Sequence, residues 1–548
     1  MDSGSFSSNS SSLSEFTIKN LKDMREFNLQ FIDSSKNQFD IFSKIYNTYD
    51  SSFIFESLTG PRELAETSII GFDPSLLIQC NTQNFMIVDN RKRKIIKKIK
   101  VTEPLEQLRS IIPKITKSEK SEKIKNYRYI GGAVGYVSYD AIRFWEKLPK
   151  PKKKILNFPL LEFGIFKDGI LYDHLEKQAY YFSTEDQRQS RIDQINKIIS
   201  DKNIDKYKED KDINNSEQFV KCSIPKRNIS KREFIRMVKK AQRYIYDGDI
   251  FQVVLSKNFK FEIEGNLLNV YSRLRDINPS PYMYLFKINK RCIIGSSPEM
   301  LLRVTGDIIE TFPIAGTRQV IRDDEVANKK MAEDLLKDEK ELAEHTMLVD
   351  LARNDVGRVS TFGTVRVKSL MRIKKFSHVQ HIVSHVIGKL DKKYDVFDAL
   401  KAVFPAGTVS GAPKIRAMEI INELEPERRE PYAGALGYFS FNGSCDFAIT
   451  IRSIFVNGKK GYVQSGAGIV MDSIPENEWD ETERKADAMI SVLRSIIMKR
   501  DTYHTKHRQE AKFSKKDHTA KRLVIPSTNS RHNRSIKLFE NDKVIYKI

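Results

Sequence analysis

A polar stretch at residues 201–229, DKNIDKYKEDKDINNSEQFVKCSIPKRNI, divides the chain into two parts that differ in sequence pattern. Its composition is typical of a linker, because it offers few apolar side chains that a core could bury. We therefore expect a mixed region before it, at residues 19–200, and a folded unit after it, at residues 230–495. A chain of 548 residues is long enough for two or three domains.

The second part begins with a clear helix signal. Ser230 and Glu233 have the spacing of a capping box, and the apolar residues that follow recur on one side of a helix that ends near Gly248. Further on, helical patterns alternate with β-branched runs such as DIFQVVLSKNF and DFAITIRSIFV. From the residues alone, we expect a single α/β unit here.

The two ends of the chain differ in composition from the rest. Residues 1–18 are rich in serine and contain no Lys or Arg, so we expect a disordered tail without the basic leader of secretory or organellar signals. Residues 496–548 form a basic extension whose order and role the sequence does not indicate. None of the four cysteines belongs to a CxxC pair, which argues against a zinc site, a disulfide framework or a thiol nucleophile. A reducing cytoplasm is the expected location.

The net charge of +21 raises the question of nucleic-acid binding. Residues 91–126 hold 13 basic and 4 acidic side chains, and residues 501–548 hold 12 and 5, which leaves +5 for everything else. Lysine-rich runs of this kind are usually solvated faces or tails, so we expect no nucleic-acid partner and keep a basic nucleic-acid-binding or scaffold protein as a distant alternative. No apolar run approaches the roughly 18 residues of a membrane span, so we expect no membrane association.

Two segments place acidic side chains on one face of a helix. In residues 340–360, Glu341, Glu344 and His345 fall on the same side, and in residues 475–488 the same is true of Glu478, Glu481 and Lys485. Two such faces could supply oxygens to Mg²⁺, which keeps several waters and needs few protein carboxylates. The plain alternative is two surface helices with scattered acids, and spacing alone does not decide between them.

Several other segments carry possible binding groups. FPAGTVSGAPK (404–414) and QSGAGIV (464–470) are dense in small residues and lack a dinucleotide fingerprint, so they are either plain turns or loops whose N–H groups hold a carboxylate. Arg452, in the strand-like AITIRSIF, needs an anion if it is buried, either as a structural ion pair or as a substrate clamp. His381 and His385 would face away from His378 in a strand, so we expect no histidine cluster.

Taken together, the motifs resemble those of the chorismate-utilising enzymes, and in particular of the anthranilate synthase component I family. The resemblance covers roughly residues 30–495 and rests on these segments: GDIFQVVLS (248–256), NPSPYMYLF (278–286), SSPEML (296–301), PIAGTR (313–318), ELAEHTMLVDLARND (341–355), HVQHIVS (378–384), FPAGTVSGAPK, YAGALGYFS (432–440), QSGAGIV and ENEWDET. It implies an α+β fold in which central antiparallel β-sheets pack as a sandwich with flanking helices and two interleaved subdomains. Residues 19–200 would then be the regulatory domain and residues 230–495 the chorismate-binding catalytic domain, with residues 201–229 as the linker.

Two positions indicate the chemistry within this family. Water-adding relatives carry a lysine base where this chain has Gln252, and aminodeoxychorismate synthases commonly carry a lysine at the position of Ala315. Because Ala315 leaves space for a small nucleophile, the resemblance implies a lyase that adds ammonia to chorismate, loses the C4 hydroxyl and eliminates pyruvate to give anthranilate. This reaction is the first committed step of tryptophan biosynthesis. The alternative is an aminodeoxychorismate synthase component I of the type that lacks the lysine.

The resemblance also assigns roles to individual residues. It implies that Glu344 and Glu481 are the main Mg²⁺ carboxylates, with Glu478 as a further metal ligand and Glu341 as a water-mediated ligand or acid–base group. It places Gln252, His381 and Thr408 at catalytic positions, with His381 as the proton partner near the departing hydroxyl. The implied substrate-binding residues are Gly316, Thr317, Tyr432, Arg452, Gly466, Ala467, Gly468 and Lys485.

Control and assembly follow from the same resemblance. The segments FIFESL and NPSPYM resemble a tryptophan-feedback pocket, with Glu56, Ser57, Pro281, Tyr282 and Met283 as the inhibitor-binding residues. No glutaminase elbow occurs in this chain, so the resemblance implies a separate glutamine amidotransferase subunit, component II, as the source of ammonia. We expect the two subunits to form a heterodimer or heterotetramer.

Overall fold

The computed structural model describes residues 27–32, 36–58, 67–112, 127–184, 188–201, 220–376 and 379–514, with side chains up to residue 496. The expected tail 1–18, most of the linker 201–229, His378 and the last part of the extension 496–548 lie outside the described residues. The chain divides into two compact units, Met1–Ile497 and Met498–Ile548. None of the described helices is both long and apolar enough to cross a bilayer.

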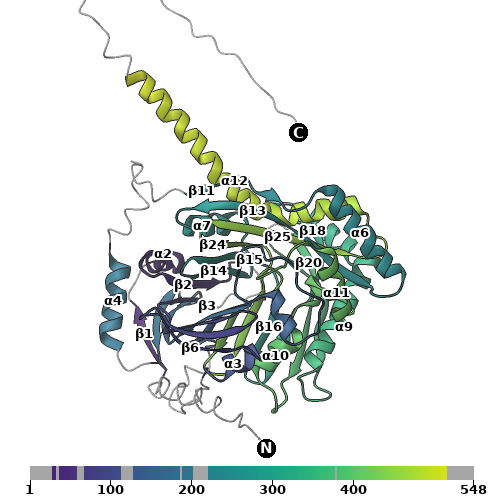
Figure 1. Cartoon of the computed structure of the whole chain (residues 1–548), viewed down its shortest axis with the longest axis horizontal. Coiled ribbons are helices and arrows are strands. Elements are labelled where there is room, and N and C mark those ends of the chain that lie inside the picture. The colour runs from purple at the N-terminus through teal and green to yellow at the C-terminus, as the bar shows by residue number, and fades with distance from the viewer. Residues whose placement is uncertain are drawn as a thin grey trace, which may run out of the picture. The chain divides into compact units, whose positions relative to one another are not determined.

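Two large sheets form the centre of the first unit (Figure 1). The strand order of the first sheet is β1 (Asn28–Ile32), β10 (Gln178–Ser183), β9 (Asp168–Asp173), β3 (Thr67–Phe72), β2 (Ser51–Glu56), β14 (Tyr282–Ile288), β15 (Arg291–Ser297), β24 (Ser453–Asn457), β25 (Lys460–Ile469), β13 (Gln252–Glu264) and β11 (Lys221–Cys222), with β12 (Lys226–Arg227) and β21 (Gly411–Ala412) also paired to β13.

The second sheet has the order β18 (Ile314–Gln319), β20 (Val379–Lys389), β17 (Ile308–Thr311), β16 (Met300–Thr305), β23 (Cys445–Ile449), β22 (Ala435–Ser440), β7 (Gly132–Val137), β8 (Leu161–Phe166), β4 (Leu76–Cys80), β5 (Asn84–Asp89) and β6 (Lys94–Lys100), with β19 (Arg366–Lys375) paired to β20. Its central strands β7, β8 and β22 are buried along their whole length. Buried strands of this kind have continuously apolar or small sequences instead of alternating ones.

The strand ladders of both sheets are antiparallel, including those of β13 with β25, β14 with β15 and β22 with β23. This confirms the α+β class with central antiparallel sheets, and the α/β unit expected from the residues alone is wrong. A periodicity of helices and β-branched runs does not distinguish parallel from antiparallel pairing, because both present the same local pattern.

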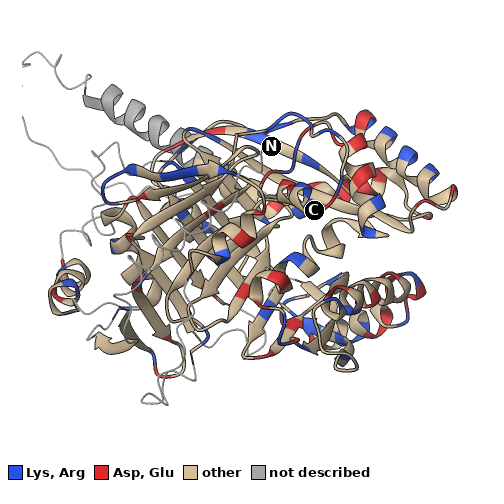
Figure 2. Cartoon of the chain, turned by 60° about the horizontal axis from the view of Figure 1, so that its bottom comes forward, with Lys and Arg blue, Asp and Glu red and all other residues tan. Residues whose placement is uncertain are grey.

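The described residues also form helices, several of which pack on the two sheets. They are α2 (Gln38–Thr48), α3 (Pro104–Arg109), α4 (Arg188–Ser200), α6 (Lys231–Tyr246), α7 (Leu268–Ile277), α8 (Glu325–Leu335), α9 (Glu339–Gly357), α10 (Val396–Val403), α11 (Lys414–Leu424) and α12 (Pro475–Ser514), with 3₁₀ turns η3 (Tyr139–Phe144) and η4 (Gly407–Val409). The predicted capping box at Ser230 is present and starts α6, and Gly248 follows the helix with a positive φ of 83°. Figure 2 shows basic and acidic residues side by side along these helices, while the strands are mostly uncharged.

The largest core lies between the two sheets and takes side chains from both. There Phe53 and Phe286 of the first sheet contact Phe166 and Tyr136 of the second. Strands from residues 19–200 and from residues 230–495 therefore meet in both sheets, and the N-terminal region is not a compact unit of its own. The polar stretch is a boundary in composition only, because strand pairing between distant segments decides which residues share a core.

Two of the places where the chain passes from one sheet to the other lie next to each other. Pro298 and Glu299 connect β15 to β16, and residues 450–452 connect β23 to β24. The two connections are hydrogen-bonded to the neighbouring strands, with the Ile449 amide 3.1 Å from the Glu299 carbonyl and the Ser296 amide 3.1 Å from the Arg452 carbonyl. Glu299 and Arg452 are therefore fixed at the junction of the sheets.

Candidate active site

Four glutamates from α9 and α12 lie near one another. They are Glu341, Glu344, Glu478 and Glu481, and we call them the acidic group. The pKa of Glu344 is raised to about 7, chiefly by burial and then by the negative charges of Glu341, Glu481 and Glu478, while Lys340 opposes the shift. Like charges perturb a carboxyl in this way only at short range. The two acidic helix faces expected from the sequence therefore meet in space.

The α12 side of this group is held by a lysine. Lys485 Nζ lies 2.5 Å from Glu481 Oε1 and 3.2 Å from the Gly466 carbonyl oxygen. The pKa of Glu478 is raised, first by burial and then by Glu481, although a hydrogen bond from Ser473 counteracts the rise. Lys485 thus joins the acidic group to β25.

The fit of a divalent ion depends on these carboxylates. Within the described residues, no three His, Cys, Asp or Glu side chains stand close enough to hold a metal ion directly. Mg²⁺ keeps several of its waters and needs only a few protein oxygens, so ligands bound through water can stand further apart. Carboxylates that are partly buried and mutually repulsive gain the most from a cation between them. The donor set of Glu344, Glu478 and Glu481 therefore fits a hydrated Mg²⁺ ion.

Glu341 faces the same region but has an ion-pair partner. Arg318 lies 3.3 Å from Glu341 Oε1 and 2.9 Å from Asp338 Oδ2. Asp338 also caps α9 by accepting from the Glu341 amide at 3.2 Å. Glu341 is therefore neutralised in place, which suits a residue that contacts a ligand through water better than one that binds a metal ion directly.

Arg452 lies in the turn between β23 and β24, not inside a strand as the sequence suggested. Its φ is +52°, and its Nη1 donates to the Lys485 carbonyl oxygen at 2.9 Å. Burial lowers the pKa of Arg452, and the charges of Tyr432 and Glu481 only partly offset this effect. A partly desolvated guanidinium without a carboxylate in contact can bind an anionic ligand strongly.

Tyr432 and Gln252 lie directly against β25. A Cβ atom at Gly466 would stand 3.0 Å from the Tyr432 hydroxyl, and one at Gly468 would stand 2.7 Å from Gln252 Nε2. Gln252 is buried, and its Oε1 has no hydrogen-bond partner among the described residues. The glycines thus allow two polar side chains to approach the strand.

Residues 464–470 were expected to form a loop, and this expectation is wrong. Residues 464–469 belong to β25, where Gly466, Ala467 and Gly468 pair with Ser256, Leu255 and Val254 of β13. Pairing of β25 with β24 ends at Val463, so the other edge of this stretch lacks a neighbouring strand in the described part of the sheet. Because N–H groups alternate along a strand, only every second amide faces that edge.

His381 is a neutral imidazole with a defined tautomer. Its Nδ1 lies 2.8 Å from the Gly316 carbonyl oxygen and 3.1 Å from Thr317 Oγ1. Because a carbonyl only accepts, Nδ1 carries the proton and Nε2 is the acceptor. Burial lowers the pKa of His381 to about 4, with further contributions from Arg452 and Lys485. His381 can therefore take up a proton at Nε2 but is not a cationic acid at neutral pH.

Gly316 forms a bulge in β18. The register with β20 shifts between Ala315 and Thr317, and Gly316 has a φ of +64°. A Cβ there would stand 3.0 Å from Leu335 and 3.2 Å from Glu341 Oε2. The bulge turns the Gly316 carbonyl toward His381, which explains why glycine is needed at this position.

Glu299 is a candidate catalytic residue that the sequence reasoning missed. Burial raises its pKa to about 8, and the neighbouring Thr408 side chain and Ile314 backbone, together with the Lys485 charge, counteract the rise only in part. Thr408, in η4, lines the same small pocket as Glu299. The available signal was an acid inside the apolar run SSPEML, because a buried carboxyl in such a run is held protonated.

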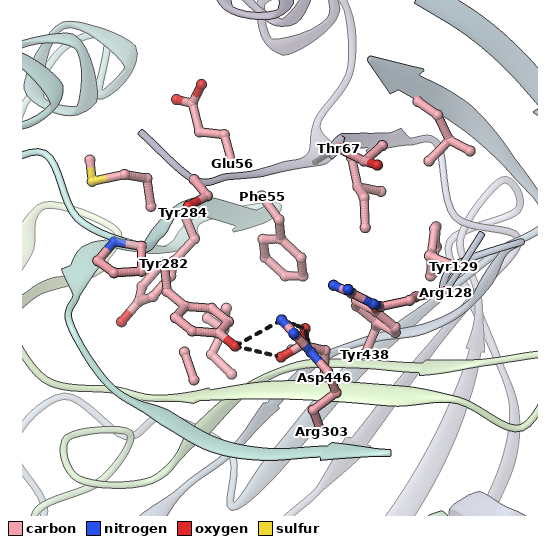
Figure 3. A pocket seen from close by; sticks show the side chains of 18 of the residues that line it. Phe55, Glu56, Thr67, Arg128, Tyr129, Tyr282, Tyr284, Arg303, Tyr438 and Asp446 are labelled. Carbon is pink, nitrogen blue, oxygen red and sulfur yellow. Dashed lines mark hydrogen bonds and ion pairs between the residues drawn. The ribbon is translucent and has the colours of Figure 1, made fainter. Parts of the chain in front are cut away.

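The predicted inhibitor residues line a separate pocket between the two sheets (Figure 3). Ser57, Pro281, Tyr282 and Met283 all belong to its wall, and none of the four acidic-group glutamates does. At its base, the Tyr282 hydroxyl donates to Asp446 at 2.9 Å and Arg303 pairs with Asp446 at 2.7 Å.

Glu56 also lines this pocket, but its carboxylate is occupied elsewhere. It accepts hydrogen bonds at 2.6 Å from both Tyr271 and Arg275, and Gln38 donates to it at 3.2 Å. Figure 3 shows this side chain directed away from the pocket. Glu56 therefore supports the wall, while Tyr282 and its partners present polar atoms to the space.

Comparisons with known proteins agree with this geometry. Residues 51–491 match the model of a family described as chorismate binding enzyme. Anthranilate synthase component 1 of Methanothermobacter marburgensis is 46% identical over 481 residues, which is 87% of this chain and 96% of that protein. The corresponding protein of Aquifex aeolicus is 39% identical over 469 residues, which is 85% of this chain and 93% of that protein.

Solved structures give the same result. Anthranilate synthase component I from Streptococcus pneumoniae superposes with a TM-score of 0.65 at 35% identity and covers 79% of this chain and 93% of its own. A menaquinone-specific isochorismate synthase from Escherichia coli has a TM-score of 0.60 at 17% identity, covering 88% of this chain and 99% of its own, and shows a likeness of fold alone.

Proposed function

Because this chain belongs to the chorismate binding enzyme family, we propose that it is an anthranilate synthase component I, a lyase that converts chorismate and ammonia to anthranilate and pyruvate. The observation that carries this proposal is the combination of the acidic group on α9 and α12 with Ala315 and Gln252 at the positions that distinguish the acceptor. Neither residue is a lysine, so neither position offers a water-activating base or a nucleophilic amine.

Chorismate carries two carboxylates, and the site offers two kinds of partner for them. Arg452 and the Tyr432 hydroxyl would hold the enolpyruvyl carboxylate, since the Tyr432 hydroxyl lies beside β25 and no carboxylate in the described part of the chain pairs with Arg452. Glu344, Glu478 and Glu481 would hold Mg²⁺ with its waters, and Lys485 would add a second positive charge nearby. When bound, the metal ion would neutralise the ring carboxylate and favour the elimination.

Two side chains are suited to the proton transfers. A carboxyl with a pKa of about 8 is protonated at neutral pH, so Glu299 would donate a proton to the departing C4 hydroxyl while ammonia bonds to C2. In the second step a proton leaves C2 and pyruvate departs. Neutral His381 would accept that proton at Nε2, because its Nδ1 is engaged with the Gly316 carbonyl.

An assay with chorismate, Mg²⁺ and an ammonium salt tests the function through anthranilate fluorescence. We expect turnover with ammonium and none with glutamine as the sole nitrogen donor, since ammonia from glutamine would come from a separate glutaminase subunit. Addition of a component II subunit should then permit glutamine to replace ammonium. An aminated product that retains the enolpyruvyl group would instead identify an aminodeoxychorismate synthase, and a salt-titrated DNA shift without turnover would identify a nucleic-acid-binding protein.

Arg452→Ala is expected to reduce kcat/KM for chorismate by about 10- to 150-fold. The change removes a charge-assisted contact of about 1.5 to 3 kcal/mol from a partly desolvated site. Steady-state kinetics with ammonium as donor measure the effect, and Arg428→Ala, which changes an arginine whose Nε donates to the Lys152 carbonyl, serves as the control. Wild-type kinetics in Arg452→Ala would assign this arginine a structural role.

Tryptophan is expected to inhibit the enzyme by binding between the sheets. The pocket offers aromatic walls from Phe55 and Tyr284 and a polar base at Asp446 and Arg303, which suits an amphipathic aromatic ligand. The adjacent crossings from β15 to β16 and from β23 to β24 carry Glu299 and Arg452. A ligand that changes the spacing of the sheets would therefore move both residues together. Initial rates at increasing tryptophan concentration measure this, with phenylalanine as the control ligand. Activity unaffected by millimolar tryptophan would contradict the prediction.

A further inference from the structure

A buried lysine lies on the far side of the helix that supplies the acidic group. Lys257, on β13, has a side chain that is 0% exposed, and its Nζ lies 2.6 Å from Glu483 Oε1 on α12. The same Nζ lies 2.9 Å from the ring centroid of Trp479, and the rings of Phe234 and Phe259 stand within 5.7 Å. Lys257 therefore contacts α12 through one anion and one aromatic ring.

Arg227 completes this arrangement from the outer side. Its guanidinium binds both oxygens of Glu483, at 2.8 and 2.7 Å, and also stacks near Trp479. The Arg227 side chain is 49% exposed, whereas Lys257 is fully enclosed. Burial lowers the pKa of Lys257 to about 8, although Glu483 and Asp480 favour the charged form. We call Lys257, Arg227, Trp479 and Glu483 the lysine clamp.

The lysine clamp and the acidic group occupy different faces of α12. Trp479 and Glu483 are four residues apart and form one stripe, while Glu478, Glu481 and Lys485 form another. At 100° per residue the centres of these stripes are about 150° apart around the helix axis. A rotation of α12 that pulls Trp479 and Glu483 away from Lys257 must therefore also turn Glu478 and Glu481 away from α9.

We propose that Lys257 is a positioning residue, which fixes the rotation and height of α12 on β13 so that Glu478 and Glu481 meet Glu344 at the metal site. The inference rests on the proposed function, because it concerns the Mg²⁺ site named there. Lys257 touches neither substrate nor metal. It acts through Glu483 and Trp479, and the outer partners of metal-binding side chains commonly influence metal affinity in this way.

The sequence supports a role for the clamp as a unit. Its four residues come from three separate segments, and one of them, Arg227, lies within the polar stretch at residues 201–229. A buried ammonium is costly unless an anion and favourable π faces surround it. The chain nonetheless retains this charge beneath α12, where a methionine of similar length would pack without that cost.

The test uses Trp479 as a reporter of metal binding that does not depend on turnover. Trp145 is the other tryptophan of the chain, so the Trp145→Phe background leaves Trp479 as the sole indole. Mg²⁺ is titrated with chorismate present and ammonia absent, and fluorescence and calorimetry give the dissociation constant. Lys257→Met should weaken Mg²⁺ binding by about 10- to 100-fold. At saturating Mg²⁺, we expect kcat of Lys257→Met to lie within about threefold of the wild-type value. Such a recovery shows that the substitution lowers metal affinity and not the rate of the chemical step.

A matched control is an ion pair that joins α6 to the same helix, α12. Lys231 pairs with Asp480 of α12 at 3.5 Å, but both side chains are about half exposed. Lys231→Met should therefore leave Mg²⁺ affinity unchanged, since exposed pairs contribute little. Glu483→Gln provides a second, milder variant of the clamp if Lys257→Met does not fold, because the Glu483 side chain is 28% exposed.

The outcomes separate this inference from the proposed function. Absence of Mg²⁺ binding in the wild-type protein would overturn the metal site itself. If the wild-type protein binds Mg²⁺ and folded Lys257→Met binds it with the same affinity, the inference is overturned and the function is left intact. If Lys257→Met does not fold, unchanged Mg²⁺ affinity in Glu483→Gln has the same meaning. A lower melting temperature with unchanged Mg²⁺ affinity would likewise reduce the lysine clamp to a stabilising contact.

Discussion

Glu299→Gln is expected to lower kcat for anthranilate formation by about 10²- to 10⁴-fold, the usual contribution of a general acid. The substitution preserves the shape of the side chain at the junction of the sheets but removes its acidic proton. KM for chorismate should change much less, because Glu299 does not belong to the groups assigned to the carboxylates. Steady-state kinetics with ammonium as donor measure both constants.

The pH profile gives this prediction a second readout. With a pKa of about 8, Glu299 loses its proton as the pH rises through 8, so wild-type kcat should fall on the alkaline side. In Glu299→Gln that alkaline limb should disappear. Glu430→Gln is the control. Glu430 is also buried, and burial raises its pKa to about 7, but its carboxylate accepts from the Leu156 and Asn157 amides and has no role in the proposed reaction. A wild-type kcat in Glu299→Gln would remove Glu299 from the mechanism.

Glu344→Gln is expected to raise the Mg²⁺ concentration required for half-maximal activity by at least about 10- to 100-fold, since it removes a carboxylate from the metal site itself. Glu481→Gln should act in the same direction. The size of the effect is measured by Mg²⁺ titration at constant ionic strength, both as activity and as calorimetric binding. Glu339→Gln, which changes an exposed carboxylate in the first turn of the same helix, is the control.

The pH dependence of Mg²⁺ binding follows from the same carboxyl. A metal ligand must be deprotonated, and Glu344 is half protonated near pH 7 because burial and its neighbouring glutamates raise its pKa. Mg²⁺ affinity in the wild-type protein should therefore increase as the pH rises from 6 to 8. This increase should be smaller in Glu344→Gln. A Mg²⁺ titration that neither substitution nor pH alters would contradict the assignment of Glu344.

The acidic faces of α9 and α12 show what local pattern can predict. A spacing of three residues placed Glu341 with Glu344 and Glu478 with Glu481, because helical geometry is fixed by the backbone. The same reasoning left open whether the two faces meet. That required the packing of helices about 130 residues apart in sequence, which no local spacing encodes.

Arg452 and Glu299 show where sequence reasoning fails. Arg452 has the neighbours of a strand residue but lies in a turn with positive φ, and Glu299 has no helical or strand partner to mark it. Both positions owe their properties to these sheet crossings, where burial raises the pKa of Glu299 and lowers that of Arg452. Burial of this kind depends on which strands pair, and the pairing here joins segments from both halves of the chain.

By itself the sequence determined the helix faces, the capping box of α6, the absence of a cysteine framework and, through its motifs, the family and the antiparallel sandwich. The tertiary structure decided that residues 19–200 share both sheets with the rest of the first unit, that Glu299 is held protonated and that His381 is neutral. Local features follow from backbone geometry and residue spacing, which are present in any short segment. Desolvation and charge proximity arise only when distant segments exclude water together, so they could be known only from the folded chain.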